Sequence, residues 1–147
     1  MIEDFRLSPN FWFYELTGSA DHPELVEQNR EIAFNDPEIM ANLELMTEEY
    51  LEPTRCIHHE AMYGLSGFRS DDLNTAVGGA DASQHKLAMA TDFTMDDPEM
   101  LEYIFSLVEG GNFPVLFHQI IYYPDRKFIH FGMPTGVNDG QFWVQGA

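Results

Sequence analysis

The stretch GGADASQHKLAMATDF, residues 78–93, places His85 and Asp92 seven positions apart beside a glycine pair and a serine. Neutral imidazole and carboxylate are both ligands that zinc takes in proteins, and a catalytic site uses three protein ligands with a fourth position open to water. The stretch therefore predicts two zinc ligands on one short segment. The glycines allow the backbone to turn in towards the metal. A third ligand has to come from elsewhere in the chain.

The attractive third ligand is His130, in the apolar run FIHFG, residues 128–132. Strand alternation would point its side chain away from the face of its neighbours Ile129 and Phe131. A single histidine in an apolar strand is more often a hydrogen-bonded core residue than a ligand, so a domain without metal stays an alternative. His118, in the preceding run VLFHQIIYY, competes for an approach to the same site.

The other histidines and the single cysteine have structural interpretations. His58 and His59 are adjacent near the end of a predicted helix, where a partly exposed pair would stabilise the helix dipole. His22 lies in a polar loop and is assigned no role. Cys56 has no second cysteine to pair with, so we expect a free, buried thiol.

Composition limits the classes of function. The 147 residues suit a single domain, and 44% hydrophobic and 14% aromatic residues are typical of a globular chain. Seven basic residues against 25 acidic ones give a net charge of −18, which argues against nucleic acid as a partner. The same charge disfavours a freely diffusing enzyme that acts on anionic bacterial walls, because the two repel each other. We also expect no membrane span and no secretory signal, since the N-terminus lacks a basic segment before its apolar residues.

Helix signals are clearest in two places. Asn35 or Asp36 can cap a helix that begins at Pro37 and is expected to run to about Glu52, where Pro53 would end or kink it. Its inward positions are Ile39, Leu43, Met46 and Tyr50.

The second strong helix signal begins at Pro98, after a cap at Asp96 or Asp97, and ends at a glycine pair. Its expected inward residues are Met100, Ile104 and Leu107. Between the two helices, residues 60–68 read as a short buried strand running into a turn, and residues 69–79 as a short capped helix.

The last third of the chain favours strands. Residues 115–123 and 128–132 are rich in β-branched and aromatic side chains and flank the turn PDRK, so they predict an antiparallel hairpin. The tail, residues 136–147, predicts either an edge strand or packing of Phe142 and Trp143 on the core. The fold class is therefore α+β, with helices packed on a small antiparallel sheet.

These motifs resemble a known family. SGFRSDDLNTAVGGADASQHKLAMATDF, residues 66–93, is similar to the core signature of the zinc D-alanyl-D-alanine peptidases, in which an SG-aromatic-RS turn precedes Ser-x-His and an Asp follows seven residues after the His. Residues 118–132 resemble the closing hairpin of the small phage-type members, and residues 5–19 resemble their opening. The resemblance covers nearly the whole chain and implies the fold that these peptidases share with Hedgehog-type domains.

The resemblance implies roles for individual residues. His85, Asp92 and His130 become the zinc ligands, and Ser83 contacts substrate. Arg69 would bind the carboxylate end of the peptide, which suits a permanently charged guanidinium.

Two of these assignments have structural alternatives. Arg69 could instead anchor its turn to Asp71 or Asp72, and Ser83 could simply cap or bond the turn.

The sequence departs from the family at the catalytic carboxylate. Many members have an acid three residues before the second histidine, where this chain has Lys127, and phage-type relatives end the preceding strand with glutamate, where it has Tyr123. The nearest acid is Asp125, in the turn, which reaches the metal only if the hairpin bends over it. Asp125 and Tyr123 are therefore the candidate catalytic residues. Ala88 replaces a glycine that the family usually has, and its methyl is expected either to crowd the substrate or to shift the backbone.

Two functional hypotheses follow from the resemblance. The first is a zinc peptidase, phage-encoded, that cuts D-amino-acid-containing stem peptides of peptidoglycan. The second is a catalytically degenerate relative that serves as a structural or wall-binding module with other virion proteins as partners. The virion, and the host cytoplasm before lysis, are the settings that the resemblance implies.

Overall fold

A five-stranded sheet with strand order β3-β4-β6-β5-β7 carries the functional residues of the chain. The computed structural model describes residues 1–146. The strands are β3 Tyr63–Ser66, β4 Ala90–Thr94, β6 Phe128–Gly132, β5 Gln119–Tyr123 and β7 Gln141–Val144. Neighbouring strands are antiparallel except β7, which pairs parallel to β5. A separate small hairpin joins β1 Arg6–Ser8 and β2 Phe11–Trp12.

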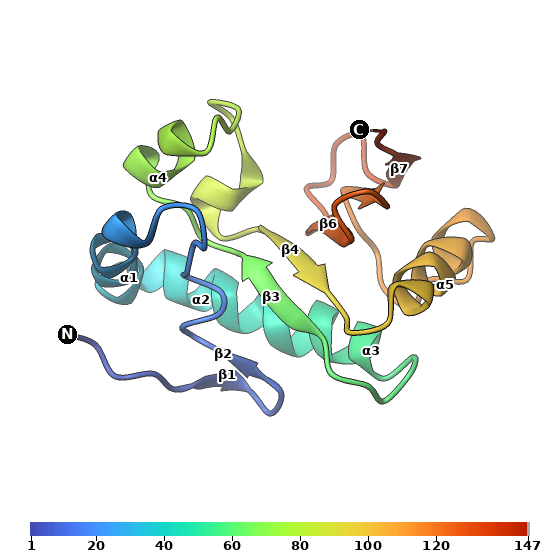
Figure 1. The fold of residues 1–147 in the computed structure, drawn as a ribbon, viewed down its shortest axis with the longest axis horizontal. Helices are drawn as coiled ribbons and strands as arrows, with labels where there is room; N and C mark the ends of the chain where they lie inside the picture. The colour runs from blue at the N-terminus through green and yellow to red at the C-terminus, as the bar shows by residue number, and fades with distance from the viewer. Residues whose placement is uncertain (147) are drawn as a thin grey trace.

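The helices flank this sheet and confirm the α+β prediction. Figure 1 shows the rod formed by α2, η2 and α3 crossing behind β3 and β4, with α5 beside the far edge of the sheet. The helical elements are η1 Pro23–Leu25, α1 Val26–Phe34, α2 Pro37–Leu45, the π-helical η2 Met46–Leu51, α3 Glu52–Arg55, α4 Asp71–Ala76, η3 Gln84–Leu87 and α5 Pro98–Glu109. No helix of residues 1–146 combines the length and apolarity needed to cross a membrane.

Strand alternation gives the sheet two different faces. Phe93, Ile129 and Phe131 are buried in the hydrophobic core, together with Leu43 and other residues of the helical rod. The alternate positions on the same strands point to the opposite face. That second face carries the polar residues described below.

Helix α2 begins where the sequence predicts, and the helical rod that it opens ends later than predicted. The Asp36 side chain accepts hydrogen bonds from the backbone N–H groups of Glu38 and Ile39, and Pro37 occupies the first helical position. Of the two outcomes expected at Pro53, an end or a kink, the end does not occur, since helical structure continues through η2 into α3 and ends at Arg55. Proline lacks the N–H of a regular α-helical turn, and a π-helical segment directly before it changes the hydrogen-bond spacing.

Helix α5 is capped by Asp97, as predicted, but buries a face one position away from the expected one. Its buried residues are Leu101, Ile104, Phe105 and Val108, whereas Met100 and Leu107 are only half-buried. The Phe105 ring contacts Tyr122 on β5 and Phe142 on β7, at 5.6 and 6.2 Å between centroids. Packing of this large ring decides which face of the helix is turned inward.

Two expectations about burial are wrong. β3 is the edge strand of the sheet, and its residues alternate between exposed and half-buried rather than forming a buried run. The buried apolar residues of that stretch, Met62 and Phe68, flank the strand instead. Cys56 is exposed, because it lies at the C-terminal cap of α3 where the chain leaves the helix.

The tail forms the edge strand β7, one of the two outcomes that the sequence left open. Phe142 and Trp143 remain 43% and 38% exposed, so neither becomes a full core residue. Because β7 runs parallel to β5, the sheet is mixed rather than purely antiparallel.

Glu52 ties the β1–β2 turn to the helical rod and makes stability depend on pH. Its carboxylate accepts hydrogen bonds from Ser8 Oγ (2.6 Å), Asn10 N (2.8 Å) and Asn10 Nδ2 (2.7 Å). Partial burial raises the pKa of Glu52, but these bonds outweigh it and lower the pKa below its ordinary value of 4.5. The stabilisation is therefore present above about pH 4.5 and is lost as pH falls through the depressed pKa.

Replacing Glu52 by glutamine is expected to lower the free energy of unfolding at pH 7 by about 1 kcal/mol, because charged hydrogen bonds become neutral ones. Urea unfolding at pH 7 and pH 3 measures the effect, and the variant should differ from wild type less at pH 3. Glu49→Gln, at an exposed position on the preceding turn, is the control. An equal loss at both pH values would contradict the role of the charge.

Candidate metal centre

Three potential metal ligands from three separate elements meet on the polar face of the sheet. They are His85 of η3, Asp92 of β4 and His130 of β6, and one ligand atom from each lies within 4.8 Å of the others. His130 Nδ1 is 2.9 Å from Asp92 Oδ1, and His85 Nε2 is 3.4 Å from the same oxygen. Two imidazoles and one carboxylate form a donor set that suits zinc and leaves a coordination position free.

Strand register accounts for the approach of Asp92 and His130. They are directly paired residues of β4 and β6, so their side chains leave the sheet on the same face. His85 reaches them from the short helix η3, whose start is capped by Ser83 Oγ accepting from the His85 N–H at 3.2 Å. The chain leaves η3 through Ala88 at φ 57 and returns as β4.

The protonation states of the group favour metal binding. His85 Nδ1 donates to the Gly67 carbonyl oxygen at 2.7 Å, which fixes the tautomer and leaves Nε2 directed at Asp92. Burial lowers the pKa of His85, so the ring is neutral at physiological pH. Burial raises the pKa of Asp92, but the hydrogen bond from His130 Nδ1 and the interaction with His85 outweigh it and lower the pKa, so the carboxylate is ionised.

Arg69 lies beside this group and is held from several directions. Its Nη2 is 3.5 Å from Asp92 Oδ2, and Nε and Nη1 donate to Ser66 Oγ at 3.2 Å and Asn74 Oδ1 at 3.4 Å. Anchoring to Asp71 or Asp72, the alternative that the sequence left open, is therefore wrong. Asp71 pairs with Lys86 at 3.0 Å instead.

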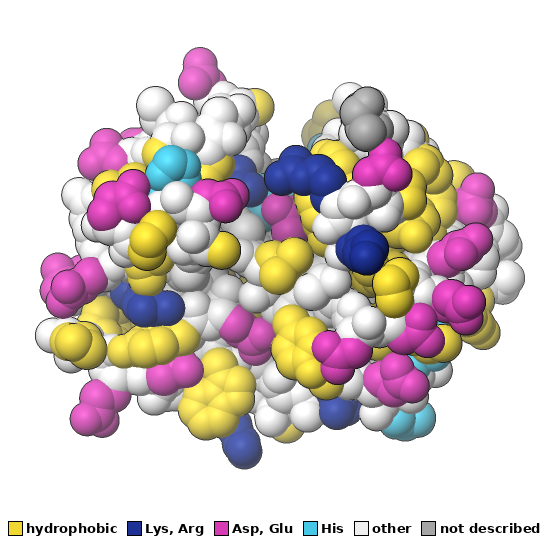
Figure 2. Space-filling model, in the orientation of Figure 1, with side chains coloured by type: hydrophobic (Ala, Val, Ile, Leu, Met, Phe, Trp, Pro, Cys, Tyr) yellow, Lys and Arg dark blue, Asp and Glu magenta, His cyan; other side chains and the backbone are white. Residues whose placement is uncertain are grey.

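A cavity of about 900 Å³ opens above the three residues. Figure 2 shows it as a hollow between two lobes, with basic, acidic and histidine side chains exposed inside it. Its walls include Arg69, Ser83 and Tyr123, which the sequence assigned to substrate or catalysis. A ligand of peptide size can therefore reach the candidate metal ligands from solvent.

Residues 20–132 match the family described as Peptidase M15. The chain belongs to the Peptidase M15 family. The family is zinc-dependent, and the His85, Asp92 and His130 group of this chain resembles a zinc site. No curated protein matches the chain.

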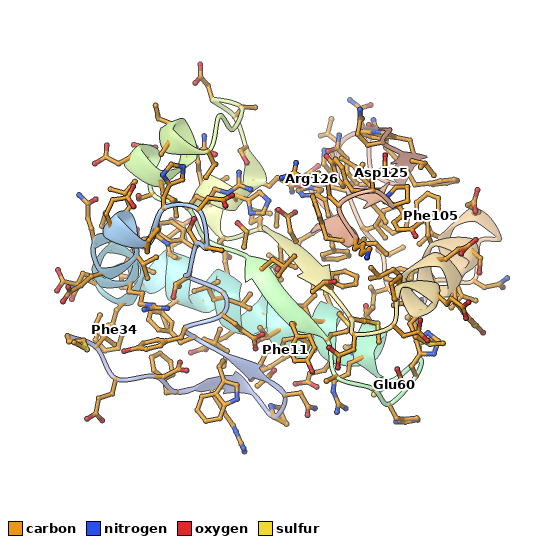
Figure 3. The ribbon with its side chains drawn as sticks, viewed as in Figure 1. Phe11, Phe34, Glu60, Phe105, Asp125 and Arg126 are labelled. Atoms are coloured by element: carbon orange, nitrogen blue, oxygen red, sulfur yellow. The ribbon has the colours of Figure 1, made fainter. Side chains whose placement is uncertain are left out.

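The M15 domain does not bring Asp125 to the cavity. Asp125 is exposed in the turn between β5 and β6, and it is absent from the cavity lining among the described residues. Its neighbour Arg126 lines the cavity instead, and Figure 3 shows the two residues pointing apart. Lys127, at φ 57, turns the backbone into β6 and is exposed. Of the two cations in the β5–β6 turn, Arg126 and not Lys127 lines the cavity.

The methyl group of Ala88 does not line the cavity, so it does not crowd a substrate there. Ala88 is fully buried and packs in the hydrophobic core. Its left-handed φ of 57 explains why a glycine suits this position, since a Cβ there costs about 1 kcal/mol.

Several lining residues carried no functional signal in the sequence. Besides Arg126, they include Gln84, Gln119 and His22, and His118, for which the sequence left an approach to the site open, lines the cavity as well. His22 lies 3.1 Å from Glu24. Gln84 comes from η3, Gln119 from β5, His22 from a loop and Arg126 from a turn, so no local pattern marks them as one group.

His118 belongs to a second polar group at the rim. Its Nδ1 donates to Asp139 Oδ1 at 2.9 Å, and Asp139 also accepts from the N–H groups of Thr135 and Gly136, at 2.9 and 2.7 Å. Led by the bond from Thr135, these contacts lower the pKa of Asp139 to about 2. His58 and His59 lie away from the cavity, at the end of the helical rod, where His58 packs edge-on against Tyr103.

Proposed function

We propose that this M15 domain is a zinc-dependent peptidase that hydrolyses D-amino-acid-containing peptides of bacterial peptidoglycan and that it is encoded by a phage. The observation that carries the proposal is the convergence of His85, Asp92 and His130 at the floor of an open cavity. The resemblance of residues 66–93 to zinc D-alanyl-D-alanine peptidases supports the substrate class.

Zinc is the metal that best fits the three side chains. Their donor atoms are two imidazole nitrogens and one carboxylate oxygen, and the Gly67 carbonyl orients His85 from behind. A zinc ion at this position would polarise the scissile carbonyl and lower the pKa of a bound water.

Arg69 and Ser83 are the proposed substrate contacts. The Arg69 guanidinium lies 3.5 Å from Asp92 and lines the same cavity, so a peptide carboxylate bound to it would be close to the metal ligands. Ser83 uses its Oγ as an acceptor for the His85 N–H, and its hydroxyl proton remains available to a substrate carbonyl.

Tyr123 is the proposed catalytic hydrogen-bond donor. Burial, and then the negative charge of Asp92, raise the pKa of its hydroxyl, so the phenol stays protonated at neutral pH. A protonated phenol cannot act as a base, but it can donate to the oxyanion that forms when water attacks the carbonyl. Tyr123 lines the cavity, whereas Asp125 does not.

Replacing Tyr123 by phenylalanine is expected to lower kcat/KM by about 10- to 100-fold, because one oxyanion donor is lost. Zinc content should not change, because the hydroxyl is not among the ligands. Tyr122→Phe is the matched control, since Tyr122 points to the other face of β5 and packs on Phe105. Equal activity of Tyr123→Phe and wild type would remove Tyr123 from the mechanism.

The proposed function is tested by mass spectrometry of purified peptidoglycan fragments after incubation with zinc-loaded protein. His85→Ala serves as the blank. Loss of D-alanine or cleavage of a cross-link, absent from the blank, is the expected result. Identical fragments in both samples would refute the peptidase assignment.

A second candidate function is a zinc-bearing structural or wall-binding module of a virion. The observation that favours it is the cavity lining, in which Asp21 and Asp92 are the only carboxylates among the described residues. Asp92 is already engaged by both histidines and Arg69. This function predicts stoichiometric complexes with wall fragments or virion proteins and no turnover, which light scattering and the same mass spectra would measure.

A further inference from the structure

Two arginines line the cavity on opposite sides of the candidate metal ligands. Arg69 follows β3, at one edge of the sheet, and Arg126 lies in the turn between β5 and β6. In the strand order, β4 and β6 with Asp92 and His130 stand between them. A peptide that spans the cavity from one guanidinium towards the other therefore passes over the metal centre.

The two guanidinium groups differ in their partners. Arg69 is engaged by Asp92, Ser66 and Asn74. Arg126, within residues 1–146, makes no ion pair and no side-chain hydrogen bond. It lies instead over the Phe128 ring, 5.4 Å from the centroid. In a chain with 25 acidic and only seven basic residues, a cation left without an acid partner at a cavity wall is unexpected.

Stacking positions Arg126 next to the proposed catalytic residue. Phe128 and Tyr123 are paired across β5 and β6, and their rings stack at 4.4 Å between centroids with an interplanar angle of 17°. The guanidinium of Arg126 lies over the Phe128 ring at the cavity wall. Neither of the two carboxylates that line the cavity, Asp21 and Asp92, forms an ion pair with Arg126 in the described residues, and Asp92 is already engaged by three other groups.

We propose that Arg126 binds a second carboxylate of the substrate, on the acyl side of the scissile bond. The proposal rests on the proposed function and narrows its substrate class. With the C-terminal carboxylate at Arg69, the residues before the scissile carbonyl lie over β6 and β5, beside Tyr123 and Arg126. The guanidinium presents paired N–H groups that match a carboxylate. The preferred peptides are those that carry a free carboxylate one or two residues before the bond that is cut.

The test compares two peptides that differ by a single charge, N-acetyl-D-Glu-D-Ala-D-Ala and N-acetyl-D-Gln-D-Ala-D-Ala. Calorimetry of the full chain with zinc removed by a chelator gives their affinities without turnover. Wild type should bind the glutamyl peptide about three- to tenfold more tightly, and the preference should shrink as salt is raised. Zinc-loaded protein should show the same preference in kcat/KM.

Arg126→Gln should remove the preference, and Arg126→Glu should shift it to N-acetyl-D-Lys-D-Ala-D-Ala. Lys127→Gln is the matched control, because it removes the neighbouring exposed cation that does not line the cavity. Equal affinity of wild type for both peptides, or a preference that survives in Arg126→Gln, would overturn the proposal. A preference that depends on Arg126 in a protein that cleaves neither peptide would refute the peptidase function while confirming the carboxylate site.

Discussion

Replacing His85 by alanine is expected to weaken zinc binding by more than about 100-fold and to reduce peptide hydrolysis to the level of the zinc-free protein. Loss of an outer partner of a zinc ligand alone costs about 10- to 100-fold, and here a ligand itself is removed. The His85 ring is buried and bonded to Gly67, and its Nε2 is one of the three converging donor atoms. Metal analysis after dialysis, together with kcat/KM, measures both effects.

The control for His85→Ala is His58→Ala, which removes a histidine outside the cavity. His58 is half-buried against Tyr103, and its Nε2 has no hydrogen-bond partner among the described residues, so its loss should leave zinc content unchanged. Circular dichroism of both variants verifies that they are folded. A His85→Ala protein that keeps one zinc per chain at wild-type affinity would show that the ion binds elsewhere.

Replacing Asn29 by alanine is expected to lower the free energy of unfolding by about 3 kcal/mol or more, since each buried backbone group left without a partner costs about 1–3 kcal/mol. Asn29 is fully buried, and its Nδ2 donates to the carbonyl oxygens of Thr17 and Phe68, at 2.9 and 3.0 Å. Its Oδ1 accepts from the Ser70 N–H at 2.7 Å. Urea unfolding at pH 7 gives the difference.

The loss of Asn29 should also reduce substrate affinity, because Phe68 and Ser70 are the two neighbours of Arg69 in the chain. Asn35→Ala is the control, since Asn35 follows the same helix but bonds only the Glu31 carbonyl at an exposed position. It should change the unfolding free energy by less than about 1 kcal/mol. Equal decreases in the free energy of unfolding of the two variants would show that the buried hydrogen bonds of Asn29 do not stabilise the segment around Arg69.

Helix starts are the part of the fold that the sequence predicts best, because their causes are local. Asp36 with Pro37, and Asp97 with Pro98, place a capping carboxylate directly before a residue with a helical φ, and both helices begin there. The end of the helical rod of α2, η2 and α3 depends on packing and on the π-helical turn before Pro53, which no local signal specifies.

The candidate ligands follow partly from local pattern. Alternation along residues 128–132 predicts the face on which His130 lies. Its pairing with Asp92 depends on strand order, which no local pattern gives, and the ligand set was implied by the resemblance. The sequence does not predict which side chain of the β5–β6 turn faces the cavity. That depends on how the backbone turns at Lys127, which places Arg126 at the cavity and Asp125 away from it. Asn29 carried no signal either, because its three partners come from distant segments.

The direct pairing of Asp92 with His130 has a further consequence for assembly of the sheet. Sliding β4 by one residue against β6 would send one of the two side chains to the core face and separate the donor atoms. A metal ion that requires both residues therefore binds only when the two strands are in the native register, and it does not stabilise any shifted register. Anything that binds only the native state stabilises it by mass action. The ion would therefore stabilise the native register of β4 and β6, in addition to any catalytic role.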